Sequence, residues 1–269
     1  MEHPAWTMVV VNRLFGKLAL ALLNALHIQP SNPDYPIPNH VAMEFIVFAV
    51  AAVFFLWLKA HMSVDRPGAA QQCMETLLTN SWDLGVRDLL RDSVGHGYED
   101  FVPMIGSIGI FVLFSNLISI IPTMESPTAE VSVPFGCAVL VFVYYNWCGV
   151  RKLGGLGYGK HFLGPNPVLA PLMLPIELIS HCARLLSLTV RLWVNMFVSE
   201  LLYGIFLGLL LEFFIFLGKL NSVGYVTAPL PLLIPVIFIA LHLFVGFLQA
   251  FVFTILPVIY VSGAVASEH

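Results

Sequence analysis

The chain has 269 residues, of which 58% are hydrophobic and only 10% are charged. A soluble domain carries about 25% charged residues, so this composition excludes an ordinary soluble protein and indicates a polytopic membrane protein. The formal net charge of −4 and the absence of a dense Lys/Arg cluster argue against a nucleic-acid surface, and we expect no nucleic acid among the partners.

The beginning of the chain differs from the rest and is the first of two predicted domains. Residues 6–27 fit an amphipathic helix at the membrane surface, and a proline-rich linker follows them. We interpret residues 1–40 as an N-terminal periplasmic or interfacial segment and residues 41–269 as the membrane domain.

The membrane domain is predicted to be all-α, with about five membrane-embedded helices. Three are ordinary spans and two are long, strongly tilted helices that form a hairpin, with a turn over residues 219–228. The expected spans are 41–58, 101–121 and 133–150, the expected long helices are 176–203 and 235–257, and a cytoplasmic amphipathic helix is expected over 69–92.

The distribution of lysine and arginine predicts the orientation of the chain. The loop after the first span contains four of these residues and the loop after the third contains three, whereas the loop between the second and third contains none. The first and third of these loops are therefore expected in the cytoplasm, with a periplasmic N-terminus and a cytoplasmic C-terminus. We expect the cell inner (plasma) membrane as the location.

A helix with a single polar stripe occupies residues 175–202. At 100° per residue, eight polar side chains fall within roughly 120° of one another: Glu177, Ser180, His181, Arg184, Ser187, Arg191, Asn195 and Ser199. A helix over 176–203 would be about 42 Å long, against a hydrocarbon core of about 30 Å, so it must tilt strongly or run partly along the membrane plane. Gly204, Gly208 and Gly218 offer places to bend.

The second long helix has a face of its own, with His242, Gly246, Gln249 and Phe253 at spacings of four, three and four. A lone intramembrane glutamine is more often a helix–helix contact than part of a path. Two polar stripes that face each other, however, indicate a water-accessible ion path. For His181, packing and a polar channel stand as equal alternatives.

Arg191 is the charge that needs a partner. An arginine at the bilayer centre costs about 2.5–3.5 kcal/mol and does not lose its proton in a protein. Glu200 is about 13 Å along the helix axis on the opposite face, and Glu177 is about 21 Å away. We therefore expect an intramembrane carboxylate on a partner chain. For Arg184, nearer the cytoplasmic end, reaching to the membrane edge is an equal alternative.

The segment SLTVRLWVNMFVSELL resembles the signature of subunit a, from the membrane sector of the F-type (rotary) ATP synthase. The chain keeps the family pattern at Ser187, Leu188, Arg191, Leu192, Asn195, Met196, the aromatic Phe197, and Glu200. It departs from the pattern at Trp193-Val194, in place of Phe-Gly, and at Val198-Ser199, in place of Ala-Gly. The loss of glycine indicates altered helix packing rather than lost chemistry.

A second block supports the same resemblance. His242 lies seven residues before Gln249-Ala250-Phe251, and the chain ends in Ser-Glu-His, as in some bacterial members. Weaker agreement comes from Asn116-Leu117-Ile118 and from Pro127-Thr128-Ala129. The resemblance covers about residues 40–269.

The resemblance implies roles for individual residues. Arg191 would face the proton-carrying carboxylate of rotor-ring subunit c, favour its ionised form and separate two half-channels, so that protons cross only when the ring turns. The implied outer half-channel consists of Asn195, Glu200, His242 and Gln249. The implied positions toward the cytoplasm are Glu177, Ser180 and Ser187.

The resemblance also implies partners: rotor-ring subunit c, peripheral-stalk subunit b, the rest of the ATP synthase complex, and the lipid bilayer. No GxxxxGK[ST] motif occurs, so the chain is expected to be non-catalytic on its own. We expect no cofactor and no metal. One alternative is a stand-alone secondary transporter with an intramembrane charged site, for which no internal repeat is evident. Another is a non-transporting scaffold subunit, which leaves the polar stripes unexplained.

Overall fold

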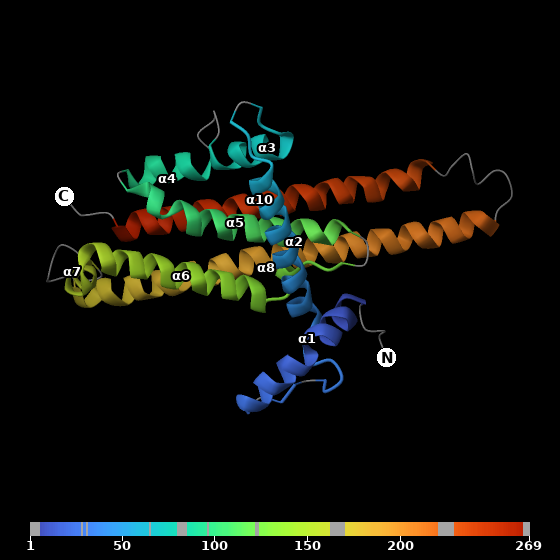
Figure 1. Cartoon of the computed structure of the whole chain (residues 1–269), viewed down its shortest axis with the longest axis horizontal. Coiled ribbons are helices and arrows are strands. Elements are labelled where there is room, and N and C mark those ends of the chain that lie inside the picture. Colours follow the sequence, from blue (N-terminus) through green and yellow to red (C-terminus); the bar gives the residue numbers. More distant parts are fainter. Residues whose placement is uncertain are drawn as a thin grey trace.

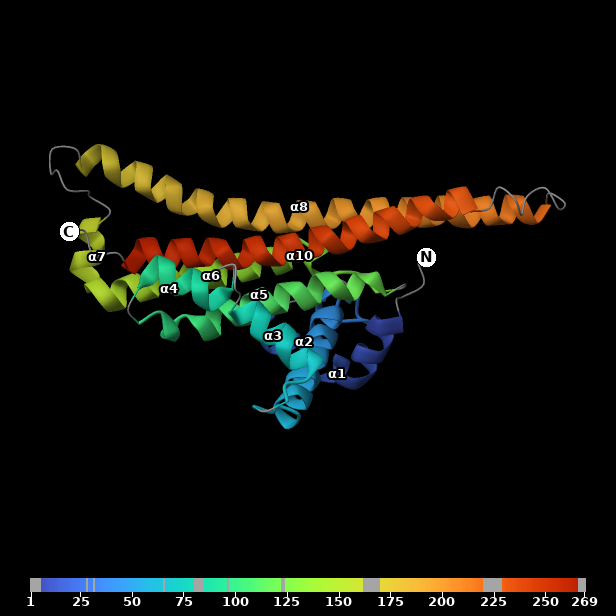
Figure 2. The ribbon, with the colours of Figure 1, turned by 90° about the horizontal axis from the view of Figure 1, so that it is seen from above.

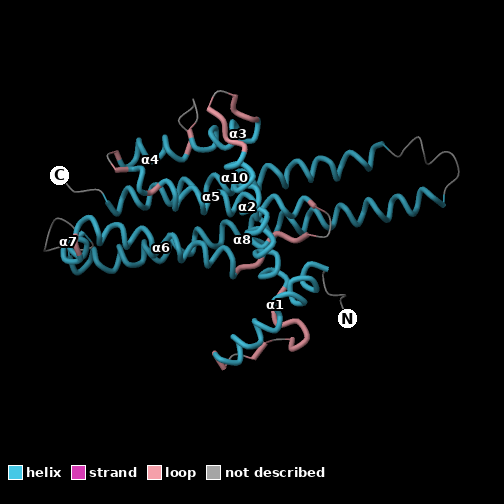
Figure 3. Tube along the Cα trace, in the orientation of Figure 1, coloured by secondary structure: helices cyan, strands magenta, loops and turns pink. Residues whose placement is uncertain are grey.

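The computed structural model describes residues 6–27, 29–30, 32–64, 66–79, 85–95, 97–121, 124–161, 170–219 and 229–265. Within these ranges the chain forms helices and loops, without a strand (Figure 3). The α-helices are α1 (Trp6–Ala25), α2 (Asn39–Ala60), α3 (Ala69–Leu78), α4 (Val86–Val94), α5 (Val102–Leu117), α6 (Ser132–Leu153), α7 (Gly155–His161), α8 (Ala170–Lys219) and α10 (Pro229–Val265). Short 3-10 helices occupy Tyr98–Asp100, Ile118–Ile120 and Pro127–Ala129. The predicted all-α class is confirmed.

Six helical stretches in the described ranges are long and apolar enough to cross a membrane. Five of them contain α2, α5, α6, α8 and α10, which the sequence predicted as membrane-embedded helices. The sixth is α1, which we expected on the membrane surface and which has the length and apolar content of a span. The chain is therefore a multi-pass helical membrane protein.

The prediction of a single amphipathic helix over residues 69–92 is wrong, because the structure has two helices there, α3 and α4. Thr79 directly after α3 has an extended backbone (φ −140°, ψ 118°), and so does Gly85 directly before α4 (φ −69°, ψ 153°). Asp88 lies in the first turn of α4, where the helix dipole favours a carboxylate. Residues 80–84, between the two helices, lie outside the described residues.

The helix that carries the polar stripe, α8, is longer than predicted at both ends. It has 50 residues, a length of about 75 Å at 1.5 Å per residue. Pro175 lies within its N-terminal part, where proline removes one backbone hydrogen bond. Gly204 and Gly208 lie inside α8 without ending it, and Figure 2 shows one curved helix rather than two segments.

The other long helix, α10, also exceeds its predicted range. It begins at Pro229 rather than Pro235, because proline suits the first turn of a helix, where its missing N–H group has no helical partner. It continues past Pro257 to Val265, where Val258 and Val261 are buried and packing supports the added turns. Of the turn predicted over residues 219–228, Lys219 is the last residue of α8 and the rest lies outside the described residues.

The helices are arranged in two directions. Figures 1 and 2 show α5, α6, α8 and α10 lying along the long axis of the molecule, with α2 crossing them. In Figure 2, α10 lies between α8 and α5, and no other described helix covers the side of α8 that faces away from α10. The 22 residues of α2 are about 33 Å long and match a hydrocarbon core of about 30 Å. Because α8 is more than twice as long, it must lie at a steep tilt.

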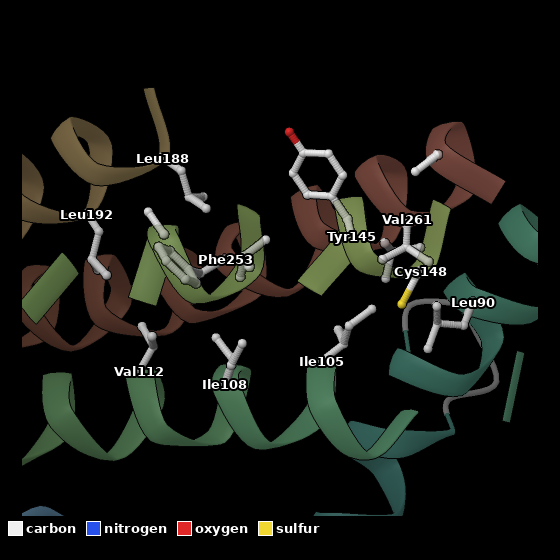
Figure 4. Close-up of a cluster of buried hydrophobic side chains, with 14 of the residues drawn as sticks. Leu90, Ile105, Ile108, Val112, Tyr145, Cys148, Leu188, Leu192, Phe253 and Val261 are labelled. Carbon is white, nitrogen blue, oxygen red and sulfur yellow. The ribbon is translucent and has the colours of Figure 1, made fainter. Parts of the chain in front are cut away.

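One apolar core joins the long helices. Figure 4 shows Leu188 and Leu192 of α8 gathered with Phe253 of α10 and with Val112 of α5. Leu192, Phe253 and Val112 are completely buried. The same core extends through Tyr145 and Cys148 of α6, so the inner side of α8 packs against α10 and α6, while α5 joins the core from the other side of α10 (Figure 2).

Candidate functional site

Arg191 lies near the middle of α8, and its side chain is exposed. Among the described residues it forms no hydrogen bond and no ion pair. Glu177 lies close to His181 instead, and Glu200 accepts a hydrogen bond from the backbone N–H of Ser126 (3.1 Å). A guanidinium left exposed on an apolar helix is a strong attractor for a negative group from outside the chain.

His242 of α10 is 3% exposed, and both of its ring nitrogens have partners. Nδ1 lies 2.6 Å from the Ser199 hydroxyl on α8, and Nε2 lies 2.7 Å from the Ser119 hydroxyl at the end of α5. Ser119 donates its only hydroxyl hydrogen to the carbonyl of Asn116 (2.8 Å), so it must accept a hydrogen bond from Nε2–H. The ring therefore carries its N–H on Nε2, and in a neutral ring Ser199 is the donor to Nδ1.

Asn116 connects His242 to Glu200. Its Nδ2 donates to the carbonyl of Gly246 on α10 (3.1 Å), and its Oδ1 accepts from the Thr128 hydroxyl (2.6 Å). The Thr128 and Ser126 hydroxyls are 2.7 Å apart, and the backbone of Ser126 donates to Glu200. We name this set the Glu200 cluster; its members are Glu200, Ser126, Thr128, Asn116, Ser119, His242 and Ser199.

The Glu200 cluster borders a pocket of about 530 Å³. Its polar lining residues are Asn39, His40, Glu125, Ser126, Glu130 and Glu200. Asn39 Nδ2 donates to Glu125 (2.7 Å), and Asn39 Oδ1 accepts from the hydroxyl of Thr7 on α1 (3.1 Å). Helix α1 is thus connected by hydrogen bonds to the acidic pocket that Glu200 lines.

Two amides meet where α8 contacts α10. Asn195 Nδ2 donates to Gln249 Oε1 (2.9 Å), one turn along α8 from Arg191. Gln249 is 1% exposed, and its Nε2 has no partner among the described residues. Because an unsatisfied buried donor costs about 1–3 kcal/mol, this position favours a water molecule or an incoming oxygen atom.

A second polar group, the Glu177 cluster, consists of Glu177, His181, Arg184, Tyr145 and Tyr260. Glu177 Oε1 lies 3.3 Å from His181 Nε2 and 3.7 Å from Arg184 Nη2. His181 Nδ1 lies 2.7 Å from the Tyr145 hydroxyl, and the Arg184 guanidinium lies 5.5 Å from the Tyr260 ring centroid, a cation–π distance. The sequence left open whether Arg184 reaches to the membrane edge, and the structure pairs it with Glu177 and Tyr260. The sequence also left open whether His181 is packed or lines a polar channel; the side chain is buried and lies close to two polar partners, Glu177 and Tyr145.

An apolar layer lies between the two clusters. Along α8, Leu188 and Leu192 come between the Glu177 cluster and Glu200; along α10, Phe253 comes between His242 and Tyr260. All three apolar side chains belong to one core and are at most 1% exposed. Arg191 lies at the level of this layer on α8, where its side chain is exposed and close enough to Tyr260 of α10 to act on it electrostatically.

The sequence-predicted site residues are only partly brought together. Glu177 lies in the Glu177 cluster, and Glu200 and His242 lie in the Glu200 cluster, while Asn195 and Gln249 form a pair of their own. The remaining three, Arg191, Ser187 and Ser180, are not brought into either cluster. Arg191 and Ser187 are exposed, Ser180 is half-buried, and none of them makes a side-chain hydrogen bond with another described residue.

Several residues of the two clusters were not singled out from the sequence. Those from the Glu200 cluster are Ser119, Ser126, Thr128 and Asn116, and those from the Glu177 cluster are Tyr145 and Tyr260. Asn116 and Thr128 belong to short motifs that pointed weakly to the same family. A hydroxyl inside an apolar helix gives no periodic signal, so Tyr145 could be found only from the fold.

The described residues contain no group of three or more His, Cys, Asp or Glu side chains able to hold a metal ion. What they contain is two separate polar clusters, each formed between α8 and neighbouring elements, with Arg191 between them along α8. The fold and the site thus define a multi-pass membrane protein with two intramembrane polar clusters. The chain belongs to the ATP synthase A chain family, whose model matches residues 41–262.

Individual relatives agree with this family. The chain is 36% identical over 269 residues to the ATP synthase subunit a of Koribacter versatilis (strain Ellin345), covering all of both chains. It is 41% identical over 234 residues to that of Solibacter usitatus (strain Ellin6076), covering 87% of this chain and 90% of the relative. It is 35% identical over 231 residues to that of Aquifex aeolicus (strain VF5), covering 86% and 98%.

Proposed function

We propose that this chain is the stator subunit of the proton channel in an ATP synthase. The observation that carries the proposal is the position of Arg191, an exposed side chain of α8 without a hydrogen bond or ion pair among the described residues, which lies between the Glu177 and Glu200 clusters along the helix. The membership of this chain in the ATP synthase A chain family supports the same role. The chain carries no nucleotide chemistry itself in this proposal and serves as a non-catalytic membrane subunit.

The exposed surface of α8 around Arg191 is where we place rotor-ring subunit c. Val190, Val194, Phe197 and Leu201 are exposed on this stretch of α8. Ser187, Arg191 and Asn195 are exposed as well, so the apolar surface adjoins one cation and two neutral polar side chains. A ring carboxylate arriving about 4 Å from the guanidinium would gain about 4 kcal/mol at an effective dielectric constant of 20. That attraction favours the ionised carboxylate only while it is opposite Arg191, as a rotary step requires.

The two polar clusters serve as two half-channels in this proposal. Protons enter through the acidic pocket at Glu200 and pass His242, Asn195 and Gln249 on the periplasmic side. They leave past Glu177 on the cytoplasmic side, with Ser180 and Ser187 along the same stretch of α8. The buried layer of Leu188, Leu192 and Phe253 keeps water from joining the two paths, and Arg191 repels a proton that would cross there.

The remaining expectations form part of the same proposal. Residues 41–269 act as the membrane domain and residues 1–40 as a periplasmic or interfacial segment, in the inner membrane, with the C-terminus in the cytoplasm. Peripheral-stalk subunit b holds this chain against rotation. ATP hydrolysis and synthesis take place on other subunits of the complex.

The test uses inverted membrane vesicles that contain the whole complex. Arg191→Ala should abolish ATP-driven proton pumping while the assembled complex still hydrolyses ATP after release from the membrane. Gln249→Leu is the matched comparison on α10, and it should slow pumping far less, because a neutral amide carries no charge. Full pumping by the Arg191 variant in an assembled complex would refute the proposal.

A further inference from the structure

A buried tyrosine, a histidine and a glutamate form an ordered chain at one end of the apolar layer. The Tyr145 hydroxyl on α6 lies 2.7 Å from His181 Nδ1, and His181 Nε2 lies 3.3 Å from Glu177 Oε1 on the next turn of α8. Tyr145 is 1% exposed and His181 is 5% exposed. Both nitrogens of one imidazole ring therefore face fixed oxygen partners away from bulk water.

The chemistry of the three groups decides the direction of the hydrogen bonds. An ionised carboxylate only accepts hydrogen bonds, so its oxygen 3.3 Å from His181 Nε2 favours the tautomer with N–H on Nε2. A neutral ring then has a lone pair on Nδ1, and the Tyr145 hydroxyl is the group placed to donate to it. Tyr145 thus selects the tautomer that points a donor at Glu177.

We propose that Tyr145 and His181 are positioning residues that hold the Glu177 carboxylate oriented for proton exchange in the cytoplasmic half of the proton path. This inference rests on the proposed function and adds to it two residues with a stated task. Glu177 must be ionised before it can take up a proton that leaves the rotor. A donor fixed at His181 Nε2 stabilises that form and keeps its oxygen atoms in one place.

Other charged and titratable groups surround His181 and shape its effect. Arg184, on its own helix, lies 3.7 Å from the same Glu177 oxygen. Tyr260 of α10 lies near both Tyr145 and the Arg184 guanidinium, with the ring centroids of the two tyrosines 5.8 Å apart. Tyr158 of α7 is close enough to interact electrostatically with both Arg184 and Glu177. Arg184 is a second, permanently charged neighbour of the same carboxylate oxygen, so the donor on His181 Nε2 adds to its effect.

The expected signature is a pH profile. Imidazole changes its charge between about pH 5 and 8, and in either charge state Nε2–H can face Glu177. Loss of that donor removes one group that stabilises a negative charge on the carboxylate, so the acid side of the conduction profile should move toward neutral pH. In inverted vesicles the cytoplasmic face is outside, where the buffer sets its pH.

The experiment measures passive proton conduction and ATP-driven pumping in such vesicles from about pH 5.5 to 8.5, a window that includes the titration range of imidazole. His181→Leu should move the acid half-maximum up by about one pH unit, a tenfold change in proton concentration. His181→Gln restores an N–H donor near the Nε2 position and should bring the half-maximum back toward wild type. Tyr145→Phe should give an intermediate shift, and Tyr144→Phe, next to it on α6, should give none.

Each outcome decides the inference. An unchanged profile in His181→Leu overturns it, and so does an equal shift in His181→Leu and His181→Gln, because the donor would then be irrelevant. A rate lowered equally at every pH also overturns it, since that marks loss of packing alone. If His181→Leu does not assemble, Tyr145→Phe and His181→Gln decide in its place. Pumping by Arg191→Ala would instead remove the proposed function itself, so the two failures are distinct.

Discussion

Ser119→Ala tests whether the orientation of His242 matters for proton movement. The change removes the acceptor 2.7 Å from His242 Nε2 and leaves a buried N–H group without its partner. A side-chain hydrogen bond between membrane helices is worth about 0.6 kcal/mol on average and up to about 1.7 kcal/mol. At 1.36 kcal/mol per factor of ten, this loss corresponds to pumping slowed by about 3- to 18-fold.

The assay is ATP-driven proton pumping in inverted vesicles, normalised to the amount of assembled complex. Ser107→Ala is the matched control, because Ser107 is an exposed serine on α5, the helix that leads directly into the 3-10 helix of Ser119, and its hydroxyl bonds only to the carbonyl of Met104 (2.9 Å). The control should pump like wild type. If Ser119→Ala pumps as fast as the control, the fixed imidazole is not a working part of the path, and the reasoning that links Ser119 to Glu200 fails.

Two further changes probe other parts of the molecule. Phe253→Asn places an amide in the apolar layer, and a polar site can hold water whereas an apolar cavity stays dry. Passive proton conduction should therefore rise in Phe253→Asn and stay low in Phe253→Leu. Equal conduction in the two variants would contradict the separation of the two clusters. Asn12→Ala removes two hydrogen bonds of 2.9 Å to the backbone of Ile37, worth about 0.5–1.5 kcal/mol each, and should speed hydrogen exchange in α1 several-fold, whereas Asn24→Ala, an exposed change on the same helix, should not.

Much of the fold could be predicted because lipid imposes simple rules. Long apolar runs and their flanking charges predicted α2, α5 and α6 within a few residues of their observed ends. The ends of α8 and α10 could not be predicted in the same way. Proline and glycine do not reliably end a membrane helix when other helices pack against it. The helix α10 continues after Pro257 because the residues that follow are buried against its neighbours.

The candidate site was predictable where charge and periodicity coincide. Arg191, Glu177 and Glu200 stand out because charged side chains are rare in apolar helices. The hydroxyl groups that connect them do not stand out, since serine and threonine are common in loops and tolerated in membrane helices. The link from Glu200 to Ser126 joins residues 74 positions apart, and no local pattern encodes such a contact.

The unbroken course of α8 ties the directions of its two ends to a residue count. One residue inserted between Glu177 and Arg191 would turn everything beyond it by about 100° and advance it by about 1.5 Å. Glu200 would then no longer lie next to Ser126, and the Arg191 guanidinium would point in another direction from the helix axis. An insertion near Lys219, past both clusters, would alter neither direction. The number of residues between Glu177 and Glu200 therefore fixes how the two clusters and Arg191 are oriented relative to one another.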